Sequence, residues 1–280
     1  MIDFRKANTI YNKSVGVLKQ VQLKNGGCLA TPKGERYPYI YPRDHAMIIL
    51  GFLSANLTKR AKKGLDFILG CQSESGAFPQ RIDTEGNDAS YKPVQIDGTG
   101  LVLHAFSEYI RHVQDFGFAK DYWENIRRAV KYIISNFFEE KKLIYTPNSV
   151  HEFPPTEQGL EIWANCVCYA ALKRMYELSC CLKREEYIWG EFSSKIKDGI
   201  LKYMWNSRKK TFVKNIRIRE SSSVLVDPDA SKYAIAEFGV LEDKDKRVAL
   251  TVEDIEKNLW NKELRGICRY PKYEGRNNGG

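Results

Sequence analysis

Tyrosine, arginine and aspartate side chains gather in a short segment that directly precedes an apolar stretch of the chain. The segment reads Tyr37-Pro-Tyr-Ile-Tyr-Pro-Arg-Asp44. A carboxylate and a guanidinium can each engage adjacent hydroxyl groups, and aromatic rings pack on the apolar face of a pyranose. Asp44 also suits the N-cap or first turn of a helix, which is a purely structural role. The segment is therefore a candidate sugar-binding loop, or simply a helix start.

Four further segments have the same character, because each combines polar or charged side chains with a loop or a helix start. They are residues 91–98, 149–163, 227–230 and 266–280. The first contains Gln95 and Asp97, where Asp97 could also serve only to cap a helix. Any one of these segments is weak evidence for a site. Five of them in one chain are a stronger indication that several loops supply one functional site.

The elements that must position these segments are helices, because the dominant apolar spacing is three to four residues. We expect about nine helices, with Thr251 as the N-cap of the last one. They lie near residues 4–20, 44–55, 57–68, 102–110, 122–133, 167–178, 188–203, 229–238 and 251–259. Strand-like pieces near 211–213 and 224–226 predict a minor β-hairpin.

The connections alternate between short turns and long loops. The long loops lie near residues 21–43, 72–96, 139–160, 204–228 and 261–280. Long loops in a compact domain are usually functional. Helix pairs joined by short turns, with long loops between the pairs, predict an all-α solenoid or toroid whose loops gather on one face. No linker-like composition divides the chain, so we expect a single domain over residues 1–280.

Composition excludes several other classes of protein. The chain has 280 residues, 43% hydrophobic and 28% charged, which excludes a disordered protein. No apolar run reaches the roughly 18 residues of a membrane span, and the N-terminus lacks a signal peptide, so we expect a cytoplasmic protein. Seven cysteines without C-x-x-C spacing indicate reduced thiols rather than a zinc site or a disulfide framework.

The basic charge leaves a nucleic-acid hypothesis open but weak. The net charge is +9, and residues 183–220 hold eleven Lys and Arg against five Asp and Glu. No zinc-finger spacing, RNA-binding aromatic motif or helix-turn-helix signal accompanies them. The cluster Arg208-Lys-Lys210 follows a turn-like Asn206-Ser207. A solvated hairpin tip explains it better, so we expect no nucleic-acid partner.

The order of these motifs resembles glycoside hydrolase family 15, the glucoamylase-like enzymes. Tyr39-Ile-Tyr41-Pro-Arg43-Asp44 resembles the family segment Y-x-W-x-R-D, and Tyr91…Gln95-x-Asp97-Gly resembles W-x-x-x-Q-x-D-G. Asp229-Ala-Ser resembles the start of a later helix, and Arg269-Tyr-Pro271 a further sugar-binding motif. The resemblance implies an (α/α)6 toroid, here with nine to ten helices, and no metal or other cofactor. It implies that Arg43, Asp44 and Arg269 hold the terminal glucose.

The same resemblance assigns the remaining site residues. Ser149-Val-His151-Glu152-Phe153 falls in the register of the family motif that carries the general acid, which makes Glu152 the candidate acid and Glu157 the backup. His151 stands where the family has Trp, and Phe153 where it has a second Glu. Together with His151, the residues Tyr41, Tyr91, Gln95 and Asp97 are implied in substrate binding. We expect Arg43, Asp44, Glu152 and Arg269 to surround a single hexose-sized hollow.

The implied activity is inverting exo-hydrolysis of α-glucosidic bonds at the non-reducing ends of malto-oligosaccharides or related glucans, a polysaccharide-degrading reaction. The family's base follows a segment that ends here at Gly280. The chain is therefore expected to lack its base and closing helices, to be impaired in activity, and to associate through an open toroid edge. The alternative is a non-catalytic module on the same toroid that binds carbohydrate or protein.

Overall fold

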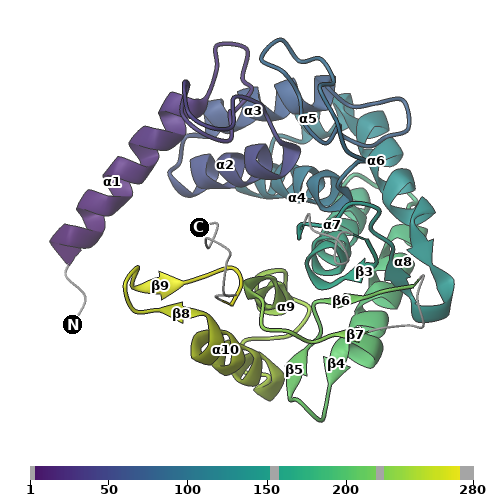
Figure 1. Cartoon of the computed structure of the whole chain (residues 1–280). Helices are drawn as coiled ribbons and strands as arrows, with labels where there is room; N and C mark the ends of the chain where they lie inside the picture. Colours follow the sequence, from purple (N-terminus) through teal and green to yellow (C-terminus); the bar gives the residue numbers. More distant parts are fainter. Residues whose placement is uncertain (1–3, 152–157, 219–223, 272–280) are drawn as a thin grey trace. The chain divides into compact units, whose positions relative to one another are not determined.

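The computed structural model of the 280-residue chain describes residues 4–151, 158–218 and 224–271 (Figure 1). Helices dominate these residues, and the strands are all two residues long. Two compact units can be distinguished by the contacts within them. The first consists of Met1–Tyr132 and Glu177–Glu185, and the second of Ile133–Tyr176 and Glu186–Gly280. The prediction of a single domain stays a prediction.

Among the described residues, the named elements of the first unit are all helices. These are α1 (Phe4–Val21), α2 (Pro42–Ser54), α3 (Thr58–Gly70), α4 (Ile96–Val113), α5 (Phe116–Asp121) and α6 (Trp123–Ser135), and the last three residues of α6 belong to the second unit. Helix α2 packs against α3 and α4. The residues of α4 that recur at helical spacing, such as Leu101, Ala105 and Phe106, are fully buried. This apolar packing holds the N-termini of α2 and α4 beside each other.

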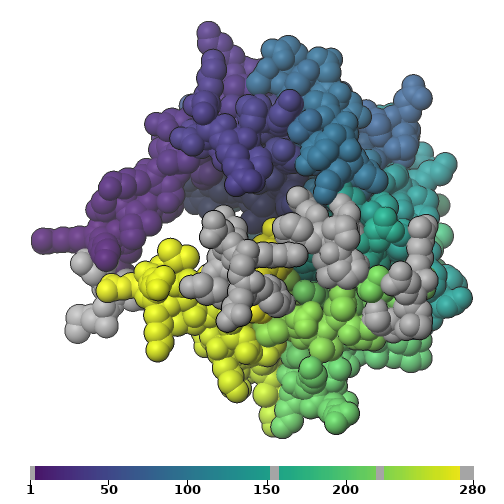
Figure 2. All heavy atoms as spheres, in the orientation of Figure 1, coloured from purple at the N-terminus to yellow at the C-terminus, as the bar shows by residue number. Residues whose placement is uncertain are grey.

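Helix α1 differs from the others in how little of it is buried. Its one buried residue is Val21, and its apolar side chains Phe4, Ile10, Tyr11 and Val17 are all exposed. The space-filling view shows α1 (purple) at the surface (Figure 2). An exposed apolar set on the first helix is what association through that helix requires. The association itself stays a prediction.

The second unit combines helices with short strand pairs. Its helical elements are η1 (Glu139–Lys141), α7 (Ile162–Cys181), α8 (Tyr187–Gly199), the π-helical turn η2 (Ile200–Met204), the 3-10 turn η3 (Ala230–Tyr233), α9 (Ala234–Glu237) and α10 (Lys246–Leu259). The last five residues of α7 belong to the first unit. The core of the second unit includes the fully buried Ile196, Ile200 and Phe212.

All strand pairs of the described residues are antiparallel and lie in the second unit. They are β1 (Phe137–Phe138) with β2 (Leu143–Ile144), β4 (Trp205–Asn206) with β5 (Thr211–Phe212), and β8 (Trp260–Asn261) with β9 (Gly266–Ile267). A three-stranded sheet has the order β3 (Leu160–Glu161), β6 (Asn215–Ile216), β7 (Val224–Leu225). Pairing of β3 with β6 places Glu161 opposite Asn215.

Gly159 is required where it stands before β3. Its φ is +137°, and a Cβ there would lie 2.2 Å from Asn215 Oδ1 and 2.7 Å from the Ile216 carbonyl oxygen. Any other residue would therefore push β6 away. This glycine directly precedes the strand that carries Glu161.

The helical prediction is confirmed in outline, and three details are wrong. Thr251 lies inside α10, where its hydroxyl donates to the Arg247 carbonyl, because Asp245 is the N-cap six residues earlier. The short helix α5 is missing from the expected set of helices; the Asp115 side chain caps it by accepting from Phe118 N. The two strand-like pieces do not pair with each other: β5 joins β4 and β7 joins β6.

The basic turn is a hairpin tip, as expected. Residues 207–210 connect β4 to β5, and Arg208 and Lys209 are exposed. Lys209 N donates to Asn206 Oδ1, which closes the turn. No helix among the described residues is long and apolar enough to cross a membrane.

Candidate active site

In the first unit, the sequence-predicted residues Arg43 and Asp97 form an ion pair. Arg43 lies in the first turn of α2 and Asp97 in the first turn of α4. Arg43 Nε donates to Asp97 Oδ2 at 2.6 Å, and Arg43 Nη2 donates to Asp97 Oδ1 at 3.3 Å. The Asp97 side chain is 1% exposed and that of Arg43 is 19% exposed. This bidentate pair fixes the plane of a guanidinium that still reaches solvent.

The neighbouring predicted residues occupy the two helix starts. Tyr41 is the N-cap of α2, so Asp44 lies in the first turn and is not the cap. Gln95 is the N-cap of α4, so Asp97 does not cap that helix. A carboxylate in the first turn is favoured by the helix dipole, which gives Asp44 and Asp97 a structural reason to be there as well.

Tyr91 belongs to an aromatic stack that sequence analysis missed. The Arg81 guanidinium lies between two rings, 4.1 Å from the centroid of Tyr39 and 4.3 Å from that of Tyr91. Arg81 Nε donates to the Ala89 carbonyl at 2.6 Å, which fixes the plane of the guanidinium. Tyr91 is 63% exposed. Arg81 therefore holds an exposed aromatic ring in place from one side. No local motif marks it, since the stack joins three separate segments.

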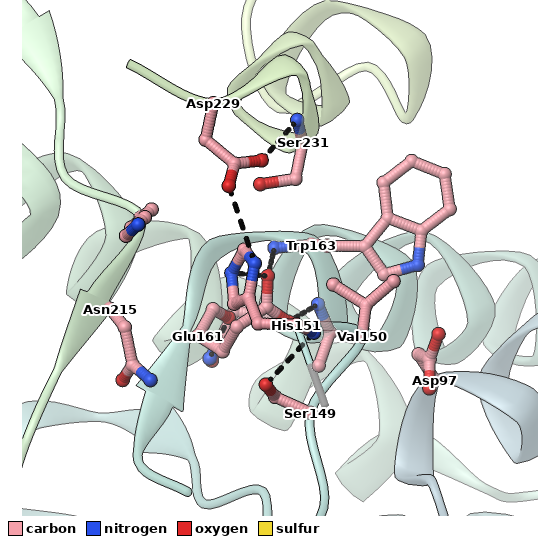
Figure 3. Close-up of polar contacts among 12 residues, drawn as sticks. Asp97, Ser149, Val150, His151, Glu161, Trp163, Asn215, Asp229 and Ser231 are labelled. Carbon is pink, nitrogen blue, oxygen red and sulfur yellow. Dashed lines mark hydrogen bonds and ion pairs between the residues drawn. The ribbon is translucent and has the colours of Figure 1, made fainter. Parts of the chain in front are cut away.

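In the second unit, His151 lies between two carboxylates (Figure 3). Its Nε2 is 3.5 Å from Glu161 Oε1, and its Nδ1 is 3.3 Å from Asp229 Oδ2. These are ion-pair distances rather than short hydrogen bonds. The side chain of His151 is 1% exposed and both carboxylates are fully buried. We call these three residues the His151 clamp.

Each carboxylate of the clamp also caps a helical element. Glu161 accepts from Trp163 N and from Ala164 N, both at 2.8 Å, at the start of α7. Asp229 is the N-cap of η3 and accepts from Ser231 N at 2.9 Å. Backbone donors therefore hold both carboxylates in place. Because both carboxylates are fixed at helix starts, the position of the His151 imidazole between them is fixed as well.

The charges of the clamp reinforce each other. Burial alone would lower the pKa of His151, but the attraction of Asp229 and Glu161 outweighs it and raises this pKa to about 9. Burial alone would raise the pKa of Asp229, but His151 and the Ser231 contacts hold it below its usual range. His151 is therefore a cation and Asp229 an anion at neutral pH.

Arg269 and Tyr270 contact the chain beside the clamp. Arg269 Nη2 donates to the Val150 carbonyl. The Tyr270 hydroxyl donates to the His151 carbonyl at 3.5 Å. The Arg269 guanidinium also lies 4.9 Å from the centroid of the Tyr270 ring. Two predicted site residues, Arg269 and His151, therefore lie near each other, because Arg269 contacts the residue that precedes His151.

The two candidate acids, Glu152 and Glu157, lie outside the described residues. Sequence analysis noted the segments that contain Glu161 and Asp229 but did not assign either residue to the site. Their one sequence signal was a carboxylate directly before a helix, which is also the signal of an ordinary cap. Within residues 4–151, 158–218 and 224–271, no group of three or more His, Cys, Asp or Glu side chains could hold a metal ion.

Comparison with known proteins gives a clear result for structure and none for sequence. No family model matches the chain, and no curated protein matches it. A glycosidase solved in complex with glucose is similar over 96% of this chain and 75% of its own, with a TM-score of 0.77 and 18% identity.

Two other glycosidases extend the comparison. The glucoamylase from Saccharomycopsis fibuligera is 18% identical, with a TM-score of 0.67 over 97% of this chain and 69% of its own. A GH63 mannosylglycerate hydrolase from Thermus thermophilus is 14% identical, with a TM-score of 0.68 over 89% and 77%. At these identities the likeness shows the fold alone. The predicted fold class is confirmed: the chain has the mostly helical fold of the glucoamylase-like glycosidases.

Proposed function

We propose that the protein is a glycosidase that releases glucose from the non-reducing ends of malto-oligosaccharides or related α-glucans with inversion of configuration. One observation carries the proposal: Arg43 and Asp97, matched to two separate sugar-binding motifs, meet in a bidentate pair 54 residues apart in sequence. The fold supports the proposal, because a glucoamylase and a mannosylglycerate hydrolase share it.

The proposed mechanism assigns Glu152 as general acid. An inverting glycosidase needs one protonated carboxyl that donates to the glycosidic oxygen and a second carboxylate that activates water, roughly 6.5–9.5 Å apart. Arg43, Asp44 and Arg269 would hold the terminal sugar, with Tyr41, Tyr91, Gln95, Asp97 and His151 around it. Glu157 is the second choice for the acid. No step of this reaction calls for a metal ion or an organic cofactor.

The experiment combines turnover with binding. Maltose is incubated with the chain and with the Glu152→Gln and Glu157→Gln variants, and the anomer of the released glucose is followed by proton NMR. We expect β-glucose from the chain and from Glu157→Gln, and at least about a hundredfold loss in Glu152→Gln. An unchanged rate in Glu152→Gln contradicts the assignment of the acid. Initial release of α-glucose contradicts inversion.

Calorimetry with maltose separates this proposal from the alternative of a non-catalytic carbohydrate-binding module. Heat of binding that is lost in Arg43→Ala, with no glucose release from the chain, would favour the module. Absence of both binding and release would exclude maltose as a ligand. Arg127→Ala is a matched control, because Arg127 forms an exposed pair with Glu124 and has no proposed role.

A further inference from the structure

We propose that Arg81 is an anion-binding residue: the open edge of its guanidinium takes the carboxylate or phosphate group of an acidic sugar. The inference goes beyond the proposed function, which concerns neutral glucans. Only the sugar part of the ligand rests on that function, because the anion part rests on the geometry of Arg81 alone. Arg81 also supports the Tyr91 ring, and the anion is bound by the edge that this stack leaves open.

The protein occupies both faces and one edge of the Arg81 guanidinium. The central carbon lies 4.1 Å from the centroid of Tyr39 and 4.3 Å from that of Tyr91. The Nε atom donates to the Ala89 carbonyl oxygen at 2.6 Å, and this bond uses one of the five N–H donors of an arginine. The donors that remain are those of the two terminal nitrogens, which lie side by side at the opposite edge.

The terminal nitrogens of Arg81 have no hydrogen-bond or ion-pair partner among the described residues. Two carboxylates of the same loop bind the backbone instead. Asp83 accepts from the backbone nitrogens of residues 85–87, and Asp88 accepts from Ser90 N. Arg81 is half-buried, and its terminal nitrogens still reach solvent. The part of the chain that the structure describes thus supplies no counterion in contact with this guanidinium.

The loop that carries Arg81 is fixed by its own backbone pairing. Ile82 and Ile40 exchange two backbone hydrogen bonds, of 2.9 and 2.8 Å, and Ile82 also pairs with Asp88. Ala89 N donates to the Arg81 carbonyl oxygen at 3.1 Å. A side chain whose plane and loop are already fixed loses little conformational entropy when it binds a ligand. The open edge of Arg81 is therefore preorganised.

The shape of this edge favours an oxyanion over a hydroxyl group. One N–H group from each terminal nitrogen can donate to two oxygens of the same carboxylate or phosphate, and such charge-assisted pairs are stronger than neutral hydrogen bonds. A sugar hydroxyl offers one oxygen and no charge. A neutral sugar therefore gains from Arg81 through the Tyr91 ring that it holds, whereas a sugar acid gains a bidentate contact in addition.

The Tyr91 ring is the reason to place the anion on a sugar. Tyr91 is 63% exposed, and Arg81 stacks on one side of it, so exposed ring surface lies beside the open edge. Aromatic surface of this kind packs on the apolar face of a pyranose. The segment with Tyr39 continues directly into α2, whose first turn carries Arg43. The acidic group is therefore expected on a sugar bound at the proposed site.

Calorimetry with sugars that share one ring tests the open edge. The probes are glucuronate and glucose 6-phosphate, with glucose as the neutral reference, at pH 7 and low salt. We expect the chain to bind one or both acids at least about tenfold more tightly than glucose, and Arg81→Gln to lose this preference. The tighter of the two acids shows whether the group is a carboxylate or a phosphate.

Arg36→Gln is the matched control. It removes the same charge from an exposed arginine that lies over a single ring, 5.2 Å from the centroid of Tyr37. The preference for the acid should survive in this variant. Equal losses in Arg36→Gln and Arg81→Gln would assign the preference to net charge and overturn the proposal. The absence of any preference over glucose in the unaltered chain would overturn it as well.

Two further measurements separate the paired donors from charge alone and a sugar acid from a free ion. Arg81→Lys keeps the charge and loses the paired donors, so most of the preference should disappear. Full retention in that variant would overturn the bidentate contact. Inorganic phosphate and acetate should bind at least about tenfold more weakly than the preferred sugar acid, because they lack the ring that packs on Tyr91. Equal affinity would overturn the sugar part of the proposal.

If Arg81→Gln does not fold, nitrogen NMR of the unaltered chain decides. The tighter sugar acid should shift the signals of the Arg81 terminal nitrogens and slow the exchange of their protons with water, whereas glucose should not. Unchanged Arg81 signals would overturn the proposal. Maltose hydrolysis without a preference for sugar acids overturns this inference and leaves the proposed function standing. The preference without hydrolysis contradicts the proposed function and leaves the anion site standing.

Discussion

Asp97 and Arg43 meet through two contacts, of 2.6 and 3.3 Å, at the first turns of two different helices. The pair joins α2 to α4 by charge at the place where apolar packing already brings them together. Because Asp97 is almost fully buried, its carboxylate depends on Arg43 for compensation. The pair is therefore both part of the proposed sugar site and part of what holds that site in shape.

Replacement of Asp97 by Asn should lower the free energy of unfolding by about 2 kcal/mol, because the charged acceptor is lost while its shape is kept. Urea denaturation measures the loss. Glu124→Gln is the control, since Glu124 and Arg127 are an exposed pair with 3.4 Å between Oε2 and Nη1. We expect less than about 0.5 kcal/mol there. Equal losses in the two variants would contradict the assigned importance of the buried pair.

Stability should depend on pH through the His151 clamp. The pKa of His151 is raised to about 9 from 6.5, so its stabilisation is complete below pH 6.5 and is lost as pH rises through 9. The size is at most about 3 kcal/mol. Urea denaturation between pH 6.5 and 9.5 should show this decline in the chain and not in His151→Gln. A decline of the same size in both would assign it to other groups.

The buried His45 should act in the opposite sense. Burial lowers its pKa to about 4, and the ring is held by Cys28 N at 3.0 Å and by the Gly64 carbonyl at 2.9 Å. The neutral ring is favoured in the folded chain, so stability should fall as pH decreases from 6.5 towards 4. Replacement by Gln should remove that slope while lowering stability at pH 7. A slope that persists in His45→Gln would exclude the histidine as its source.

Arg81 should affect sugar affinity without touching the Arg43–Asp97 pair. Its guanidinium holds the exposed Tyr91 ring, so Arg81→Ala should raise the Kd for maltose about threefold to tenfold. Calorimetry on Arg81→Ala, Tyr91→Ala and the double variant measures the coupling. If Arg81 acts through Tyr91, the double variant should bind about as weakly as Tyr91→Ala. Additive losses would instead indicate that Arg81 contacts the sugar itself.

Two glycines should respond in opposite directions to replacement by alanine. Gly159→Ala should lower the free energy of unfolding by about 3 kcal/mol or prevent folding, because its φ is +137° and Asn215 occupies the space. Gly16→Ala, inside α1 with nothing within 4 Å of the new Cβ, should raise it by up to about 1 kcal/mol. Thermal unfolding of both variants tests the pair of predictions together.

The helices were predictable because apolar residues recur every three to four residues, a spacing that places them on one face of a helix. Ile126 and Ile133 in α6 illustrate this, since both are fully buried. The predicted start of α10 was wrong because Thr251 and Asp245 are both residue types that cap helices well. The local sequence does not show which of them is the N-cap, and the structure shows that it is Asp245. Local sequence indicates that a helix is present more reliably than it locates the residue at which the helix begins.

The sequence named candidate site residues, whose roles stay predictions, but it gave no indication of how they pair. The motifs named Arg43 and Asp97 separately, and nothing in the sequence joined them. Glu161 and Asp229 looked like ordinary caps, because no local pattern links either of them to His151, their second partner. Such pairings depend on tertiary structure, which a single sequence does not encode in any local pattern.

Because one imidazole balances two buried carboxylates, we expect positions 151, 161 and 229 to vary together among homologues. A tryptophan at 151 would leave Glu161 and Asp229 without their shared counterion, so we expect a homologue with tryptophan there to lack at least one of the two acids. Homologous sequences sorted by the residue at 151 should therefore separate into those that keep both acids and those that do not.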